Sequence, residues 1–201
     1  RESEHLLAIA QRAPESLEAL RALVVLDPAI TTRGPFAVHV ERLDLALRAA
    51  ERAGAEPMLF ARAIGARGRA HMLGGQPDEA ERDLERALSL SIALGDRRLE
   101  AELLADLGVL VHRRGDLSRA QGLYERALAV DRAAGGSRTE GRVLGNLGAV
   151  HHDAHRHEQA IEHYERALSI LVINGDRRLL GIVSTNLGTL EQEQGAMSAA
   201  R

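Results

Sequence analysis

Small and apolar residues recur along most of the chain at a spacing of forty positions. The pairs Leu107-Gly108, Leu147-Gly148 and Leu187-Gly188 are in register. Alanines repeat at the same spacing, and they are Ala80, Ala120, Ala160 and Ala200, followed by Ala87, Ala127 and Ala167. A fixed period of this length is typical of a solenoid, in which each repeat buries its apolar face against its neighbours. The pattern therefore predicts stacked copies of one structural unit.

Within each period, the spacing of apolar residues predicts two helices joined by a short turn. We expect a half repeat over 36–56, full repeats over 57–96, 97–136 and 137–176, and a partial repeat over 177–201 that turns near Gly195. Residues 1–35 do not fit the register, and we expect them to form an N-terminal helical adaptor. There, Asp27-Pro28 has the form of an N-cap followed by proline at the first helical position. The predicted fold class is all-α, an α-solenoid of antiparallel helix hairpins.

Glycine and aspartate mark the expected ends of these helices. Gly95-Asp96 and Gly175-Asp176 each place a residue suited to the left-handed conformation before an aspartate that can cap the next helix. His155 stands where the register expects glycine, so we expect a strained or differently shaped turn at that position.

The composition fits this interpretation and narrows the function. Hydrophobic residues make up 45% of the chain and aromatic residues 2%, and Ala and Leu, both strong helix formers, predominate. A formal net charge of −3 with 27% charged residues argues against a nucleic-acid-binding surface. The chain has no cysteine, no signal-like start and no apolar run near the ~18 residues of a membrane span. We expect a cytoplasmic protein that binds neither nucleic acid nor membrane.

Motifs of common catalytic sites are missing from the sequence. The run Gly65-Ala66-Arg67-Gly68 has no lysine and lies in a helical register, so it is not a phosphate-binding loop. No serine stands in a GxSxG nucleophile elbow. We therefore expect a protein that is not an enzyme and needs no cofactor.

The repeated positions closely resemble the tetratricopeptide repeat pattern of Leu-Gly, a bulky residue, Ala, an aromatic residue and Ala. One copy consists of Leu107, Gly108, Val111, Ala120, Tyr124 and Ala127, and the next of Leu147, Gly148, His151, Ala160, Tyr164 and Ala167. The resemblance covers residues 36–201. The tryptophan position of the family pattern holds Ile64, Leu104, Leu144 and Ser184, and the closing proline is absent. The forty-residue period is similar to that of kinesin light chains and of the sensor arms of bacterial STAND-type ATPases and LuxR- or AfsR-type regulators.

This resemblance implies a right-handed superhelix whose first helices line a concave wall that binds a protein or peptide segment. Asn146 and Asn186 precede Leu-Gly in successive repeats, and an amide can donate to one peptide carbonyl and accept from one N–H. Two asparagines on a solvated helix face are the alternative interpretation. The full set of candidate contact residues is Asn146, Asn186, Arg62, Arg69, Asp106, Arg113, Arg142 and Asp153. The arginines are candidates to pair with ligand carboxylates.

A cluster of histidines offers a competing chemistry. His151 and His155 are four residues apart, which would put both on one side of a continuous helix, and imidazole is a common zinc ligand. However, His151 occupies a packing position of the repeat and His155 lies in an expected turn. We favour a structural role for both and expect no metal site. Tyr124 and Tyr164 are likewise expected to pack between helices.

Two functions remain open at this point. The first is a non-catalytic peptide-binding scaffold, the sensor or interaction arm of a larger bacterial signalling or transcription regulator. The alternative is a structural module that associates with itself through its C-terminal end, because the helix from Arg177 carries the apolar residues Val183, Leu187 and Leu190.

Overall fold

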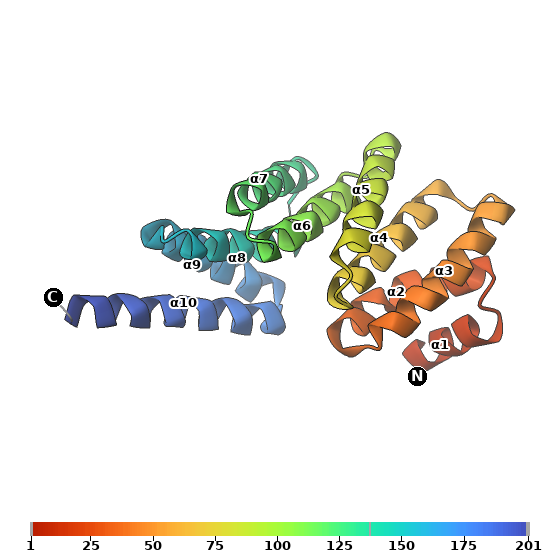
Figure 1. Cartoon of the computed structure of the whole chain (residues 1–201), viewed down its shortest axis with the longest axis horizontal. Helices are drawn as coiled ribbons and strands as arrows, with labels where there is room; N and C mark the ends of the chain where they lie inside the picture. The colour runs from red at the N-terminus through yellow and green to blue at the C-terminus, as the bar shows by residue number, and fades with distance from the viewer. Residues whose placement is uncertain (1, 137, 200–201) are drawn as a thin grey trace. The chain divides into compact units, whose positions relative to one another are not determined.

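The computed structural model describes residues 2–136 and 138–199, and these residues form ten α-helices and no strand. Figure 1 shows them in chain order: α1 (Glu2–Arg12), α2 (Leu17–Arg33), α3 (Phe36–Ala53), α4 (Pro57–Leu73), α5 (Pro77–Leu94), α6 (Arg97–Arg113), α7 (Leu117–Ala133), α8 (Arg138–Asp153), α9 (His157–Asn174) and α10 (Arg177–Ala199). Short turns join successive helices into antiparallel hairpins. The all-α, hairpin-repeat fold class predicted from the sequence is confirmed.

The chain divides into two compact units, Arg1–Asp106 and Leu107–Arg201, and the boundary falls within α6. Each unit has its own buried apolar core. Leu20, Leu43 and Ile64 are fully buried in the N-terminal unit, and Leu144 and Val150 are fully buried in the C-terminal unit.

In the N-terminal unit, α2 packs against α3 and α4, and α4 packs against α3 and α5. Helix α2 begins at Leu17 and α4 begins at Pro57, forty residues later. Helix α2 therefore has the place of a first helix in the register, although the Leu-Gly pair is missing from it.

The expectation that a helix begins at Pro28 is wrong. Helix α2 runs from Leu17 to Arg33 with Pro28 inside it. Its N-cap is Ser16, whose hydroxyl oxygen accepts a hydrogen bond from the amide of Ala19 at 3.0 Å. The carboxylate of Asp27 is buried and forms an ion pair with Arg69 of α4. It therefore does not serve as the helix cap that the sequence predicted.

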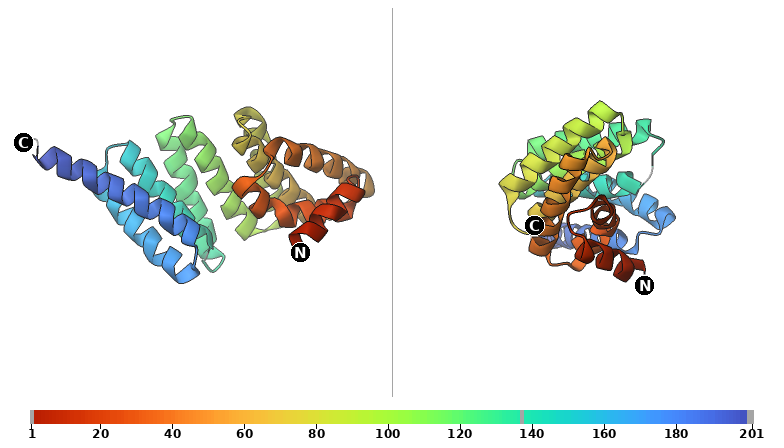
Figure 2. Two further views of the ribbon diagram at one scale, coloured as in Figure 1. Left: turned by 90° about the horizontal axis from the view of Figure 1, so that it is seen from below. Right: turned by 90° about the vertical axis from the view of Figure 1, so that its right-hand side faces the viewer.

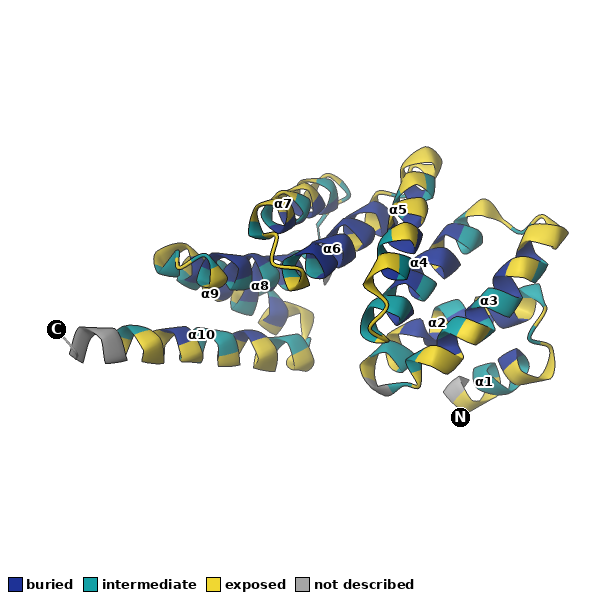
Figure 3. Ribbon diagram, viewed as in Figure 1, coloured by how far each residue is buried: buried dark blue, intermediate teal, exposed yellow. Residues whose placement is uncertain are grey.

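In the C-terminal unit, α7 packs against α8, α8 against α9, and α9 against α10. Figure 2 shows α8, α9 and α10 lying alongside one another. Exposed residues are far more frequent on α10 than on α8, as Figure 3 shows.

The expectation of a turn near Gly195 is also wrong, because α10 is continuous from Arg177 to Ala199. In the preceding hairpin, α9 packs back on α8 and so holds the turn between them. No described residue after Gly195 packs back on α10 in this way. Ala200 and Arg201 lie outside the described residues.

Three glycines at the same register position, Gly68, Gly108 and Gly148, make room for a large side chain from the second helix. A Cβ atom at Gly148 would lie 2.5 Å from the ring of Tyr164, and one at Gly68 would lie 2.9 Å from Leu84. The ring of Tyr124 fits against Gly108 in the same manner. Both tyrosines are buried, so the prediction that they pack between helices is confirmed.

The turns between hairpins follow the predicted chemistry. Gly95 and Gly175 have φ values of 71° and 69°, in the left-handed region. The carboxylate of Asp96 accepts a hydrogen bond from the amide of Leu99 at 3.1 Å, and that of Asp176 accepts one from Leu179 at 3.0 Å. His155 has φ 57° and is the only residue other than glycine with a positive φ in the described part of the chain. The expected strained turn is confirmed.

Candidate binding surface

Two asparagines and two carboxylates lie on one side of neighbouring first helices in the C-terminal unit. Asn146 and Asp153 are seven residues apart on α8, and Asn186 and Glu193 have the same spacing on α10. Residues two turns apart share a helix side. We call these four residues the α8–α10 face. Both asparagines are half-buried and both carboxylates are exposed, so the face is accessible to solvent.

Histidine–carboxylate hydrogen bonds connect successive first helices at this face. The Nε2 atom of His112 lies 2.7 Å from Oδ2 of Asp153, and Nε2 of His152 lies 2.9 Å from Oε2 of Glu193. In each pair the two residues are 41 positions apart. The carboxylate side chains remain 58% and 50% exposed, so each acid is held by the preceding repeat while it still faces solvent.

Burial and the carboxylate of Asp153 raise the pKa of Tyr164 on α9 to about 12, and the nearby amide of Asn186 on α10 opposes this shift. The hydroxyl therefore stays protonated at neutral pH. The ring of Tyr164 thus packs beside Gly148, and its hydroxyl lies near Asn186 of the α8–α10 face.

Arg69 and Asp106, two of the candidate contact residues, belong to a buried ion-pair network in the N-terminal unit. The guanidinium of Arg69 lies 2.7 Å from Oδ2 of Asp27 and 3.2 Å from Oδ2 of Asp106. His39 is 3.4 Å from the other oxygen of Asp27. Burial acts to lower the pKa of Arg69, but the two carboxylates outweigh it and raise the pKa. The network joins α2, α4 and α6. Both candidates thus form ion pairs with other residues of the chain.

The remaining three candidates are arginines, and one of them, Arg142, shares the side of α8 that carries Asn146. Arg62 of α4 pairs with Asp96 at 2.8 Å and is 44% exposed. Arg113 is exposed in the last turn of α6, and Arg142 is half-buried on α8, one turn before Asn146. Of the eight candidates, the α8–α10 face brings together Asn146, Asn186 and Asp153.

The histidine cluster divides between the core and the surface. His151 is buried and stacks on His163 of α9, with ring centroids 4.9 Å apart and an angle of 7° between the rings. His155 is exposed in the turn and does not share the side of His151. Burial, followed by the charge of Arg156 for His151 and of Arg166 for His163, lowers the pKa of both stacked residues. Within residues 2–136 and 138–199, no three His, Cys, Asp or Glu residues are placed to hold a metal ion together.

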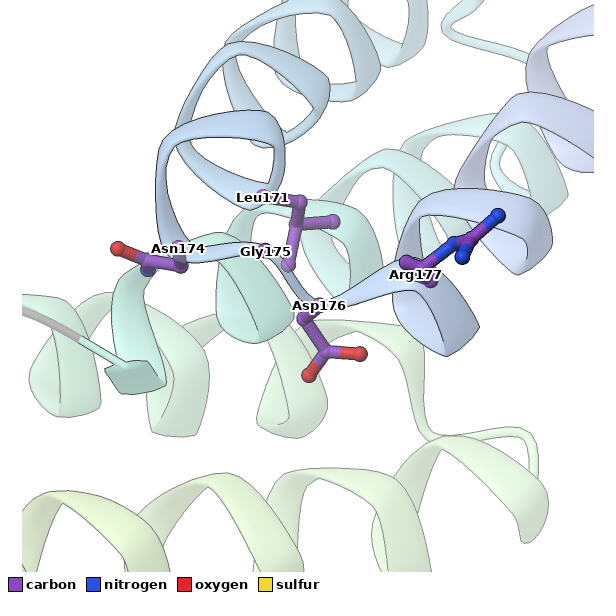
Figure 4. Close-up of a pocket in the computed structure, with 5 residues that line it drawn as sticks. All are labelled: Leu171, Asn174, Gly175, Asp176 and Arg177. Atoms are coloured by element: carbon purple, nitrogen blue, oxygen red, sulfur yellow. The ribbon is translucent and has the colours of Figure 1, made fainter.

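A pocket of about 420 Å³ lies at the turn between α9 and α10. It is lined by Leu171, Asn174, Gly175, Asp176 and Arg177. Figure 4 shows the side chains of Asn174 and Arg177 pointing in opposite directions, away from the carboxylate of Asp176. Since these polar groups do not converge on one point, the pocket lacks the geometry of a small-molecule site.

The sequence interpretation missed four residues of this region: His112, His152, Glu193 in its pairing with His152, and Tyr164 as a neighbour of Asn186. A signal for the pairs was available. His112 to Asp153 and His152 to Glu193 are both one residue longer than the repeat period, so the same pair of positions recurs in successive repeats. The proximity of the tyrosine to the asparagine has no local signal, because it depends on how α10 packs.

Comparison with known proteins identifies the family. The tetratricopeptide repeat model matches residues 59–133 and 139–201. These matches cover more than half of the chain, so the chain belongs to the tetratricopeptide repeat family. No curated protein sequence matches it. Among the described residues, no helix is long and apolar enough to cross a membrane.

Solved structures with the same fold include kinesin-light-chain-like and sensor proteins. The chain is similar to BtubC (BKLC) from P. vanneervenii, with a TM-score of 0.73, 22% identity, and coverage of 97% of this chain and 81% of that one. It is similar to a putative kinesin light chain with nearly identical TPR-like repeats from Podosopora anserina, with a TM-score of 0.68, 16% identity, and coverage of 94% and 91%. It is also similar to PH0952 from Pyrococcus horikoshii, a STAND protein with a tetratricopeptide repeat sensor, with a TM-score of 0.68 and 14% identity. The match covers 90% of this chain and 30% of PH0952.

Proposed function

We propose that this chain is a non-catalytic scaffold that binds an extended protein or peptide segment along the α8–α10 face. The observation that carries the proposal is the pair Asn146 and Asn186, two half-buried amides at equivalent positions of neighbouring first helices. Amides spaced along a surface can bond alternate peptide groups of an extended ligand without requiring a particular sequence. The exposed carboxylates of Asp153 and Glu193 border the same face.

We further propose that the scaffold is the sensor or interaction arm of a larger bacterial signalling or transcription regulator that acts in the cytoplasm. The similarity in fold to a STAND protein with a tetratricopeptide repeat sensor supports this role. The chain spans about a third of that protein, so the remainder would supply the effector function.

Self-association through the C-terminal helix is the weaker candidate. The sequence suggested that Val183, Leu187 and Leu190 form an apolar surface on this helix. In the structure Val183 and Leu190 are buried, and Leu187 is half-buried. These three residues therefore offer little apolar area to a second copy.

Substitution of both amides tests the binding proposal. A peptide is first selected from a displayed library of random peptides with the wild-type protein, and its affinity is then measured by calorimetry. We expect Asn146→Ala with Asn186→Ala to weaken binding by about 2 kcal/mol, roughly 30-fold, because each amide hydrogen bond contributes about 1 kcal/mol.

The matched control is Asn174→Ala, which changes the same residue type at the end of α9. This variant should bind the peptide with wild-type affinity. Both variants should unfold at nearly the wild-type urea concentration. Wild-type affinity in the double variant would show that the peptide binds elsewhere and would refute the assignment of the α8–α10 face.

A further inference from the structure

The two carboxylates of the α8–α10 face are paired with histidines and not with arginines. Nε2 of His112 lies 2.7 Å from Oδ2 of Asp153, and Nε2 of His152 lies 2.9 Å from Oε2 of Glu193. In the described part of the chain, neither carboxylate forms an ion pair with an arginine. A neutral imidazole donates one hydrogen bond but leaves the negative charge of the acid in place.

Partly buried acids elsewhere in the chain use arginine as their counter-ion. Asp83 lies 2.7 Å from Arg67, and Asp96 lies 2.8 Å from Arg62. The carboxylates of the α8–α10 face, by contrast, are 58% and 50% exposed. The face therefore presents two negative charges to solvent, and an arginine or lysine from outside the chain could pair with them.

The histidines also hold each carboxylate in one orientation. The imidazole fills one of about four acceptor sites of the carboxylate, so the second oxygen can accept a hydrogen bond from a ligand. Both histidines belong to the preceding first helix, α6 for His112 and α8 for His152. The position of each acid is thus set before a ligand arrives, which reduces the conformational freedom that binding has to remove.

The spacing on the helices favours a long side chain as the partner. Asp153 lies seven residues beyond Asn146, which is about 10 Å along the axis of α8. If the asparagine amides bond the backbone of an extended segment, only a long side chain of that segment reaches the carboxylate. Arginine and lysine are the long side chains that carry a positive charge. Arg142 is on the same side of α8, but it lies eleven residues from Asp153, about 16 Å along the axis.

We propose that the segment bound on the α8–α10 face carries basic side chains, and that Asp153 and Glu193 select them by accepting hydrogen bonds from their N–H groups. Such bonds between charged groups are stronger than those between neutral ones. An acidic segment would meet like charges at both positions and be disfavoured. This inference rests on the proposed function of the face, to which it adds the charge of the partner.

The test uses Asp153→Asn with Glu193→Gln, which keeps the shape of both side chains and removes their charge. Peptides are selected on the wild type from a displayed library of random peptides at about 50 mM salt. The selected sequences should contain more arginine and lysine than the starting library. In calorimetry, the double variant should bind a selected peptide about fivefold more weakly than the wild type, because two exposed ion pairs are lost.

The matched control is Glu158→Gln with Glu165→Gln, which changes the net charge by the same amount at two exposed positions of the second helix α9. It should bind with wild-type affinity. Raising the salt to about 200 mM should weaken binding by the wild type more than binding by Asp153→Asn with Glu193→Gln. Three results would overturn the inference: recovery of no peptide, selected peptides without an excess of basic residues, or an equal loss of affinity in the control.

Failure of the proposed function gives a different result. If Asn146→Ala with Asn186→Ala binds the selected peptide normally, the amides do not hold it, and the proposed function fails whatever the charge of the peptide. If instead the asparagine variant loses affinity while Asp153→Asn with Glu193→Gln keeps it, the binding face stands and the selection of basic segments is refuted.

Discussion

At the level of single residues, the glycines of the Leu-Gly pairs differ in their surroundings although they share one register position. Gly148 is in contact with Tyr164, and a Cβ atom there would lie 2.5 Å from the ring. Gly188 stands forty residues later, and nothing lies within 4 Å of the place where its Cβ would be. Both are inside helices, so their backbone conformation is the same. Substitutions at Gly148 and Gly188 therefore distinguish two effects. One is the steric effect of an added methyl group, and the other is the intrinsic cost of glycine in a helix.

We expect Gly148→Ala and Gly188→Ala to change stability in opposite directions. The first should lower the free energy of unfolding by about 1–3 kcal/mol, because a buried aromatic ring has to move. The second should raise it by about 0.5–1 kcal/mol, because alanine favours the helix and meets no neighbour. Urea denaturation followed by circular dichroism measures both. Destabilisation by Gly188→Ala would show that its face is covered in solution.

Arg69 illustrates what the sequence can and cannot show about the site. The register correctly placed Arg69 and Asp106 on first helices, but it contained no information on their partners. Asp27, which binds Arg69 at 2.7 Å, lies on a helix without the repeat pattern. Removing one partner from such a buried network leaves an uncompensated charge, so these residues are expected to matter for stability. The sequence could predict that Asn146 and Asn186 occupy equivalent positions of neighbouring repeats, because this follows from the repeat period alone.

At the level of helices, the α8–α9 hairpin contains a buried pair of histidines. His151 and His163 stack at 4.9 Å, and their Nδ1 atoms have no hydrogen-bond partner among the described residues. Burial lowers the pKa of both, and Arg156 and Arg166 add to the effect, while Glu125 and Glu162 oppose it. In the folded state, both imidazoles therefore resist protonation more than they do in the unfolded chain.

The hairpin should consequently be destabilised by acid. Because the folded-state pKa of each histidine is below its unfolded value, the unfolded chain binds more protons as the pH falls. The stabilisation by neutral histidines is complete above the unfolded pKa of about 6.5 and is lost as the pH falls from there to the lower folded values. When the pH is lowered from about 7.5 to about 5.5, the free energy of unfolding should decrease less in His163→Gln than in the wild type.

The matched control for this measurement is His5→Gln, because His5 is exposed on α1 and far from the stack in sequence. It should follow the wild-type dependence on pH. An unchanged dependence in His163→Gln would mean that other groups cause the acid sensitivity.

Most helices could be predicted from the sequence, and the exceptions have physical causes. The turns at Gly95 and Gly175 were predictable because left-handed glycine and a capping aspartate act locally. Pro28 and Gly195 were misinterpreted because proline after a capping residue often begins a helix and glycine often ends one. In α2, Asp27 pairs with Arg69 instead of capping a helix, and the helix continues through Pro28. At Gly195, α10 continues through the glycine, so glycine alone did not end the helix.

At the level of the whole molecule, the repeat architecture makes stability depend on neighbouring helices. In a solenoid each element contacts only the adjacent ones, so a helix packed on both sides is more stable than one packed on a single side. Helix α4 packs against α2, α3 and α5, whereas α1 packs mainly against α2. In the other unit, α8 packs against α7, α9 and α10. Local opening should therefore be graded within each unit.

Hydrogen exchange followed by mass spectrometry measures this gradient directly. We expect backbone amides of α4 and α8 to exchange slowest in their units, and those of α1 to exchange at least tenfold faster than those of α4, since about 1.4 kcal/mol in opening free energy corresponds to a factor of ten. Amides of α10 should exchange faster than those of α8, because many of its residues are exposed. A selected peptide bound at Asn186 should slow exchange in α10 more than in α1. Uniform exchange across all helices of a unit would instead indicate that the unit opens as a single cooperative block.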